Sequence, residues 1–427
     1  MNYQEARNFI DESVRYGGEV GLGKITRLLD YLDHPEKDLT FIHIAGTNGK
    51  GSVLSYVSTT LSMAGYCTGR YISPTLYSYE ERFQIDGQPI IKEDFIYYME
   101  RIVLAVEQME KDGYVCPSPF EIETVLAFLY FKDRKCDFVV IECGLGGLED
   151  ATNVIENTAV AVLTSISMDH MDYLGDTIGA IAKTKSGIAK PGATVVTTYQ
   201  QPEAMESILE TCQEQGCTCV CADYRKAQML SSKVEEQIFL YDGCEWTLHL
   251  AGVCQVQNAV LAIEVLKALR KRGYALSLEQ MRAGLSATKW NGRFTIIHRN
   301  PTFIVDGAHN PDAAAKFAAS MKEYFDRKRV VYIIGVFKDK QYEEVIRLTV
   351  PFATEVITIA TPDNPRALPT KELEKVISKY TDHVTSASTI EEAVEKAFQM
   401  AGEDGVIASF GSLSFIGPIT EIVERYT

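Results

Sequence analysis

The chain contains 427 residues, of which 46% are hydrophobic and 23% are charged, and its formal net charge at pH 7 is −16. This length exceeds that of one ordinary domain, so we expect two or three domains, each with its own apolar core. The acidic balance argues against nucleic-acid binding, which normally requires a basic surface, and no apolar stretch is long enough to span a bilayer.

The N-terminal part of the sequence leads into a glycine-rich loop. The first residues include an acid, Glu5, and no apolar segment, so we expect no signal peptide and a cytosolic location. The apolar run 41–45 predicts a strand, and the pattern over 52–64 predicts a helix that ends before Gly65. The loop between them is Gly46-Thr47-Asn48-Gly49-Lys50-Gly51-Ser52.

A strand, a glycine-rich turn and a helix in this order predict a phosphate-binding loop rather than a turn without a ligand. Glycines let the backbone close around phosphate oxygens, and the helix N-terminus supplies N–H groups and partial positive charge. Lys50 can reach the terminal phosphates of ATP, and Ser52 can approach a metal ion. Because Gly51 separates these two residues, the loop departs from G-x-x-x-x-G-K-[ST] and differs from those of common GTPases and motor ATPases.

Two further apolar runs, 138–141 and 159–163, alternate with helical patterns and indicate a parallel sheet covered on both faces. Glu142 ends the first run, where an acid faces the ligand-binding crevice and can hold Mg²⁺; an acid that only caps a loop is the alternative. His170 follows the second run, and Lys185 lies on or near a helix. On spacing alone, we expect a structural histidine and a solvated lysine at these positions.

The ten cysteines include one cluster with alternating spacing, Cys217, Cys219 and Cys221. On a strand these thiols would share one face. Steps of two residues suit a tetrahedral zinc site poorly, so we expect structural cysteines and keep a metal site as the alternative.

The C-terminal part repeats the alternation of strands and helices. The polar segment 290–301 contains Gly292 and is the expected junction, which gives predicted domains 1–292 and 293–427. The predicted strands are 303–305, 330–334, 356–359 and 406–408, and the helices between them include 312–325 and 389–400. The predicted fold is therefore α/β, with an N-terminal P-loop domain like that of parallel-sheet ATPases and a smaller, Rossmann-like C-terminal domain.

A second ligand-facing turn is predicted at the start of the C-terminal domain. Asp306 ends the first strand there, and His309 stands just before a helix that begins near Pro311. Arg293 lies at the junction, where an arginine can swing onto a transferring phosphoryl group. A purely structural role is equally compatible with the spacing of each of these residues.

Taken together, in order and over nearly the whole chain, these motifs resemble the folylpolyglutamate synthase and dihydrofolate synthase family, within the ATP-dependent Mur ligase superfamily. The inserted Gly51 is part of the resemblance. The other motifs that carry it are Ser73-Pro74, Glu81-Arg82, Phe120-Glu121, Gly144-Leu145-Gly146-Gly147, Asp150-Ala151-Thr152-Asn153, Asp169-His170, Lys185-Ser186-Gly187, Gln255-Val256-Gln257-Asn258 and Asp306-Gly307-Ala308-His309-Asn310-Pro311.

The resemblance implies an ATP-dependent ligase that adds L-glutamate to the γ-carboxylate of a reduced folate through an acyl phosphate. It leaves open whether dihydropteroate is a further substrate. It implies two magnesium ions, a CO₂-derived carbamate on Lys185, small-molecule partners only, and a monomer without nucleic-acid or membrane partners. The implied catalytic residues are Lys50, His170, Lys185 and Arg293. The implied ATP contacts are Thr47, Asn48, Gly49, Lys50, Gly51, Ser52, Asn258, Arg293, Asp306 and His309. The implied metal ligands are Ser52, Ser73, Glu142, His170 and carbamylated Lys185, and the implied folate contacts are Arg82, Phe120 and Glu121.

Four positions depart from the family pattern, namely Thr75, Leu148, Thr184 and Cys254. The first two bear on substrate details, particularly on dihydropteroate. The alternatives are another Mur-type amino-acid ligase and a non-catalytic ATP-binding regulator. Cell-wall Mur ligases carry a UDP-binding domain before the phosphate loop, whereas the segment that precedes Gly46 here is shorter than a common domain of ~100 residues.

Overall fold

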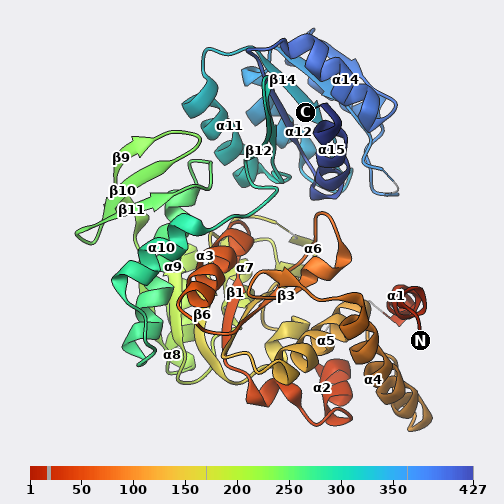
Figure 1. Cartoon of the computed structure of the whole chain (residues 1–427), viewed down its shortest axis with the longest axis vertical. Helices are drawn as coiled ribbons and strands as arrows, with labels where there is room; N and C mark the ends of the chain where they lie inside the picture. Colours follow the sequence, from red (N-terminus) through yellow and green to blue (C-terminus); the bar gives the residue numbers. More distant parts are fainter. Residues whose placement is uncertain (17–20, 170, 363, 427) are drawn as a thin grey trace. The chain divides into compact units, whose positions relative to one another are not determined.

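The computed structural model describes residues 1–16, 21–169, 171–362 and 364–426, and the chain divides into two compact units (Figure 1). The larger unit contains Met1–Ala227 and Gln257–Thr288, and the smaller contains Gln228–Val256 and Lys289–Thr427. The chain therefore enters the smaller unit twice. The domain boundary between residues 292 and 293 stays a prediction, close to the second of these entries.

Within the described residues, the larger unit is built on an eight-stranded sheet in the order β4-β3-β2-β5-β1-β6-β7-β8. The strands from β2 to β8 in this order are parallel, and β3 and β4 add an antiparallel hairpin at one edge. Their bounds are β1 (Phe41–Ala45), β2 (Thr68–Tyr71), β3 (Phe83–Ile85), β4 (Gln88–Pro89), β5 (Phe138–Glu142), β6 (Thr158–Leu163), β7 (Thr194–Thr198) and β8 (Thr218–Ala222). All residues of β1, β5 and β6 are buried, as apolar runs covered on both faces require.

Helices cover this sheet. α3 and α10 lie side by side (Figure 1), and glycine is needed at their contact because a Cβ at Gly284 would lie 2.3 Å from Thr60 Oγ1. One apolar core joins α1, α2, α4 and α5 to the strands β1, β2, β3 and β5. The helices are α1 (Tyr3–Glu12), α2 (Gly23–Asp30), α3 (Lys50–Met63), α4 (Lys92–Lys111), α5 (Pro119–Asp133), α6 (Met171–Leu174), α7 (Ile178–Ser186), α8 (Pro202–Glu214), α9 (Gln255–Lys271) and α10 (Leu278–Ala287).

The smaller unit contains a six-stranded sheet, counted over its described residues, in the order β12-β13-β17-β14-β15-β16, with only β12 antiparallel. Figure 1 shows α11 and α14 on opposite sides of β14. One apolar core contains residues of α11, α12 and α13 and none of α14 or α15, which indicates that the two sets of helices cover different faces of the sheet. The strands are β12 (Thr295–Arg299), β13 (Thr302–Val305), β14 (Val330–Ile334), β15 (Glu355–Thr358), β16 (Val384–Ser386) and β17 (Val406–Phe410). The helices are α11 (Pro311–Phe325), α12 (Tyr342–Thr349), α13 (Thr370–Ile377), α14 (Ile390–Ala401) and α15 (Ile416–Val423).

A separate three-stranded antiparallel sheet, in the order β11-β10-β9, also belongs to the smaller unit. Its strands are β9 (Gln228–Ser232), β10 (Gln237–Tyr241) and β11 (Cys244–Leu248). This sheet was not predicted from the sequence; β9 is polar and mostly exposed, and the apolar run 238–241 of β10 was not recognised as a strand.

The α/β fold and its buried strands are confirmed. The predicted helix over 52–64 was placed too late, because α3 begins at Lys50, directly after Gly49 in the left-handed conformation. Lys50 and Gly51 therefore belong to the first helical turn. Every described helix is too short or too polar to cross a membrane.

Candidate functional site

The loop between β1 and α3 has a shape that requires glycine at two positions. Gly46 has a φ of 148°, and a Cβ there would lie 1.9 Å from Thr164 Oγ1. Gly49 has a φ of 93°, and a Cβ there would lie 2.5 Å from Asn258 Oδ1. Since Gly49 is the N-cap of α3, it offers no side chain to the first-turn N–H groups, which an anion can then bind.

The loop is anchored on the residues that follow β6. The backbone N–H of Thr47 donates to Ser165 O at 2.8 Å, and that of Asn48 donates to the same oxygen at 3.3 Å. The Thr47 hydroxyl donates to Ser167 O at 3.1 Å and accepts the Ser167 N–H at 3.1 Å. Thr47 and Asn48 thus hold the loop in shape, and their contacts with ATP stay predictions.

A lysine and a carboxylate meet beside the loop. Lys50 Nζ lies 3.7 Å from Glu142 Oε1 and donates to Thr47 O at 3.3 Å. Glu142 is the last residue of β5 and is 7% exposed; β5 pairs in parallel with β1, with Ile44 opposite Glu142. The parallel register therefore brings the strand-end acid to the phosphate loop, where the sequence analysis expected it.

Lys185 is buried next to the same loop, at the end of α7. Its side chain is 5% exposed, and its Nζ donates to Gly46 O at 3.1 Å. Burial, and after it the nearby Lys50 ammonium, lower the pKa of Lys185 to about 8. The spacing-based expectation of a solvated lysine is therefore wrong. An appreciable share of this amine is uncharged near neutral pH, and the uncharged amine is the form that reacts with CO₂.

The predicted magnesium ligands fall into three groups. Glu142 and Ser52 are buried at the loop. Ser73 follows β2, which pairs in parallel with β5, with Tyr71 opposite Ile141, so Ser73 comes at the same edge of the sheet as Glu142. His170 lies outside the described residues. Over the rest of the chain, as described, no group of three or more His, Cys, Asp or Glu side chains could hold a metal. Mg²⁺ commonly takes one or two carboxylates, waters and substrate phosphates, so the residues at the loop fit this ion.

Asp306 and its neighbours form a tight turn in the smaller unit. Asp306 Oδ2 accepts the Phe294 N–H and Oδ1 accepts the Ala308 N–H, both at 2.8 Å. Burial raises the pKa of Asp306, while Arg293 and these two N–H groups oppose the rise. His309 Nδ1 lies 2.8 Å from Gly307 O, to which it can donate. Asp306 and His309 thus belong to one turn, and Arg293, in the segment before β12, lies beside it, since a Cβ at Gly307 would lie 2.6 Å from Arg293 Nη1. Asn258 lies with the phosphate loop in the larger unit.

The predicted folate contacts lie around the start of α5. Phe120 packs on Tyr71, with ring centres 5.9 Å apart, and a Cβ at Gly144 would lie 2.6 Å from the Phe120 ring. Glu121 accepts the N–H and the hydroxyl of Ser118, both at 2.7 Å, and so closes a capping box. Arg82 pairs with Glu123 rather than with Glu121. Phe120 thus adjoins the residues that follow Glu142, and Glu121 has a structural role at the helix start.

Two buried residues near the loop were not predicted to have a role. Asp150 accepts the Leu145 N–H at 2.7 Å and the Thr152 N–H at 3.0 Å, which orders the glycine-rich segment after Glu142. His43, on β1, lies 2.8 Å from Thr152 Oγ1, and burial lowers its pKa to about 3. The Asp-x-Thr spacing is a local signal for the first contact, whereas only the tertiary fold brings β1 against the 3₁₀-helix of Thr152, 109 residues away in the chain.

The three clustered cysteines lie at the edge strand β8. Cys217 and Cys219 are half-buried and Cys221 is exposed, and all three are free thiols. Cys219 also packs against the apolar core between α7 and α8. A structural role remains the better interpretation.

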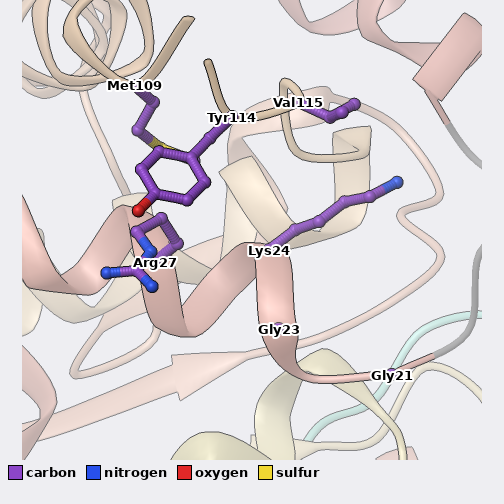
Figure 2. A pocket seen from close by; sticks show the side chains of 7 residues that line it. All are labelled: Gly21, Gly23, Lys24, Arg27, Met109, Tyr114 and Val115. Carbon is purple, nitrogen blue, oxygen red and sulfur yellow. The ribbon is translucent and has the colours of Figure 1, made fainter. Parts of the chain in front are cut away.

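A cavity of about 430 Å³ lies between α2 and the end of α4. Figure 2 shows Tyr114 over Arg27, with Lys24 extending along the other side, and the Arg27 guanidinium lies 4.5 Å from the Tyr114 ring centre. This cavity shares no residue with the phosphate loop or with any other predicted site. It therefore adds nothing to the candidate site.

Comparison with known families and proteins gives full-length similarity. The family description "Mur ligase middle domain" matches residues 44–266, and "Mur ligase, glutamate ligase domain" matches residues 292–413. The chain is 35% identical over 429 residues to the dihydrofolate synthase/folylpolyglutamate synthase of Bacillus subtilis, with 98% of each covered. It is similar to the solved Mycobacterium tuberculosis folylpolyglutamate synthase complexed with ADP (TM-score 0.88, 30% identity, 99% of each chain). It is also similar to E. coli FolC in complex with DHPP and ADP (TM-score 0.86, 27% identity, 100% and 98% covered).

Proposed function

The chain belongs to the folylpolyglutamate synthase and dihydrofolate synthase family of Mur ligases, and we propose that it ligates L-glutamate to the γ-carboxylate of a reduced folate. ATP is the co-substrate, in keeping with the ADP-bound relatives. The observation that carries the proposal is the meeting of Lys50, Glu142 and buried Lys185 around one glycine-rich loop. Relatives of this family match the chain over its full length.

In the proposed reaction, a γ-carboxylate oxygen of the folate attacks the γ-phosphorus of ATP, and ADP leaves. The glutamate amine then attacks the acyl carbon, the C–O bond to phosphate breaks, phosphate leaves, and the amine proton passes to solvent. Lys50, at the first turn of α3, offsets charge on the transferring phosphoryl group. The first-turn N–H groups of the same helix bind the phosphates of the nucleotide.

Glu142, Ser52, Ser73 and carbamylated Lys185 are the proposed holders of magnesium ions, which supply positive charge to the phosphates when bound. The low pKa of Lys185 supports carbamylation, because the modification needs an uncharged amine. Carbamylation also gives this lysine an anionic group beside the loop. His170, Arg293, Asp306 and His309 keep their predicted roles in this proposal.

The proposal also includes folate contacts at Arg82, Phe120 and Glu121. It further includes a monomeric state and a cytoplasmic location. Phe120 has the best structural support, because its ring lies against the segment that follows Glu142. Dihydropteroate is included as a second acceptor, since relatives named dihydrofolate synthase match nearly the whole chain.

The test is an assay of ATP turnover and product mass with tetrahydrofolate and dihydropteroate in parallel, each with and without glutamate. We expect phosphate release that requires both a folate and glutamate, and a product heavier by one glutamyl residue. Release with alanine or aspartate instead of glutamate would favour another Mur-type ligase. ATP binding with no turnover under any condition would favour a non-catalytic regulator.

A further inference from the structure

A buried ion pair holds one of the proposed folate contacts in place. Arg82, at the end of the 3₁₀-helix η3 (Tyr79–Arg82), places its Nη1 3.2 Å from Glu123 Oε2 on α5. The two side chains are only 14% and 7% exposed. Tyr79 donates its hydroxyl to the other carboxylate oxygen, Glu123 Oε1, at 2.5 Å. Both oxygens of this buried carboxylate are therefore engaged.

A residue of α1 also contacts this group of Arg82, Glu123 and Tyr79. The Arg7 guanidinium carbon lies 3.2 Å from the centre of the Tyr79 ring, and Tyr79 packs edge-on against Phe83 and Phe95. Such packing fixes the Tyr79 hydroxyl, which in turn fixes Glu123. The position of the Arg82 guanidinium is therefore set by several elements of the larger unit and not by its own flexible side chain.

Arg82 has five N–H donors, and Glu123 and Tyr71 do not use all of them. Its Nε has no hydrogen-bond partner within the described residues but is covered by protein, so a ligand would meet the terminal nitrogens of this side chain, which is 14% exposed. The guanidinium also interacts with Tyr71, whose ring packs on Phe120, and Phe120 lies against Gly144, two residues after Glu142. A continuous set of contacts thus joins Arg82 to the segment beside the phosphate loop.

Charge decides what such an arginine can recognise. A guanidinium already paired with a buried carboxylate is close to neutral as a unit, so it attracts an incoming carboxylate weakly and still donates to uncharged acceptors. The folate substrate has one anionic end, which must react near Lys50, and one uncharged pterin ring with carbonyl and ring-nitrogen acceptors. A neutralised arginine favours the pterin end.

We propose that Glu123 is a positioning residue that holds Arg82 as a neutralised donor for the pterin ring and thereby sets the orientation of the substrate. The proposal rests on the function proposed above and on Arg82 as a folate contact. Without Glu123, the Arg82 guanidinium loses its orientation and gains an unbalanced charge. Both changes weaken pterin recognition and strengthen attraction for the wrong, anionic end.

The experiment compares Glu123→Gln with Asp133→Asn, which removes an arginine–carboxylate pair at the other end of the same helix, where Arg101 Nη1 lies 2.9 Å from Asp133 Oδ2. For each variant, kcat and KM for tetrahydrofolate, the inhibition constant of p-aminobenzoyl-L-glutamate and the melting temperature are measured. This inhibitor has the anionic end of folate but no pterin.

For Glu123→Gln we expect KM for tetrahydrofolate to rise roughly tenfold, with kcat changed by less than about twofold. Inhibition by p-aminobenzoyl-L-glutamate stays unchanged or becomes tighter. Asp133→Asn changes none of these constants. A merely structural role predicts a lower melting temperature with both ligands weakened alike or neither affected, and either result would overturn the proposal.

If Glu123→Gln does not fold, Tyr79→Phe provides the same test, because it removes one hydrogen bond to Glu123 and leaves the ion pair. We then expect a KM increase of about threefold, again with no loss of p-aminobenzoyl-L-glutamate binding. An unchanged KM in this variant would contradict the proposal. Absence of folate-dependent turnover in the unmodified enzyme would instead overturn the proposed function, and this inference with it.

Discussion

The two units of the molecule each place an acid at the carboxyl end of a buried parallel strand, yet the two acids have different surroundings. Glu142, the last residue of β5, faces Lys50 beside a glycine-rich loop. Asp306, directly after β13, accepts the N–H of Ala308 in its own turn with one oxygen and the N–H of Phe294, just before β12, with the other. The local sequence signal is the same in both cases, a carboxylate at the carboxyl end of an apolar run.

The difference shows that strand-end position alone does not define a catalytic acid. A carboxylate that satisfies backbone donors stabilises a turn, whereas one that meets cations near a helix N-terminus can take part in phosphate chemistry. In the proposed site, the Lys50–Glu142 pair beside the helix N-terminus belongs to the larger unit, whereas Asp306, with Arg293 nearby, is engaged by backbone N–H groups in the smaller unit. The Asp306 turn of the smaller unit shapes the backbone that presents Arg293 and His309.

The largest expected effect comes from the cation in the larger unit. Lys50→Ala should lower turnover by roughly 10²–10³, because the charge on the transferring phosphoryl group loses its nearest ammonium. ADP release under saturating substrates measures the effect, and circular dichroism checks that the fold is retained. Near-normal turnover in this variant would show that the loop is not the centre of the chemistry.

Lys185→Ala tests whether the buried lysine has the role of a metal-holding anion. We expect a loss of roughly 10² in turnover, with partial recovery when propionate supplies a carboxylate in the vacated space. Lys183→Ala, an exposed lysine on the same helix, is the matched control and should change turnover by less than about twofold. Equal effects of the two substitutions would argue against a special role for Lys185.

Glu142→Gln and Asp306→Asn test whether the two acids have different roles. Asp306→Asn should lower the free energy of unfolding of the smaller unit by about 1–2 kcal/mol, because an amide cannot accept both backbone N–H groups. Trp246 and Trp290 both lie in this unit, so their fluorescence during urea unfolding measures the change. Glu142→Gln should abolish most turnover and leave this unfolding curve unchanged; the reverse pattern would contradict the assignment.

His43 in the larger unit and Asp306 in the smaller unit should contribute to the pH dependence of stability with opposite signs. The pKa of His43 is lowered by burial to about 3, so below pH 6.5 the unfolded chain binds a proton that the folded chain does not. Stability of the larger unit is then lost as the pH falls, by about 1.4 kcal/mol per pH unit. The pKa of Asp306 is raised by burial, so its contribution is lost as the pH rises through the folded pKa.

Urea unfolding followed by circular dichroism between pH 4.5 and 7 checks the histidine effect, which corresponds to the uptake of roughly one proton per molecule on unfolding. His43→Gln should flatten the slope below pH 6.5, since glutamine can keep a hydrogen bond to Thr152 and does not titrate. An unchanged slope would mean that other groups cause the acid instability.

Much of the fold follows from local patterns, and the misses have a physical cause. The buried strands β1, β5, β6, β13, β14, β15 and β17 were predicted because a strand covered on both faces is a continuous apolar run. In the sheet β9–β11, β9 is polar and mostly exposed and β11 is partly exposed, so neither carries such a run. β10 does carry an apolar run, over 238–241, and this strand signal was overlooked. The edge strands β12 and β16 are half-buried and were missed for the same reason as β9 and β11.

The sequence by itself determined the phosphate loop, since only glycine allows the backbone at positions 46 and 49, and it determined the family through an ordered set of motifs. Tertiary structure alone decided that Lys185 is buried beside Gly46, 139 residues away along the chain, and that Arg82 is paired with Glu123. Local propensity depends on neighbouring residues, whereas burial and charge pairing depend on which distant segments pack together. The pKa of Lys185 and the charge state of the Arg82 pair are therefore properties of the folded unit.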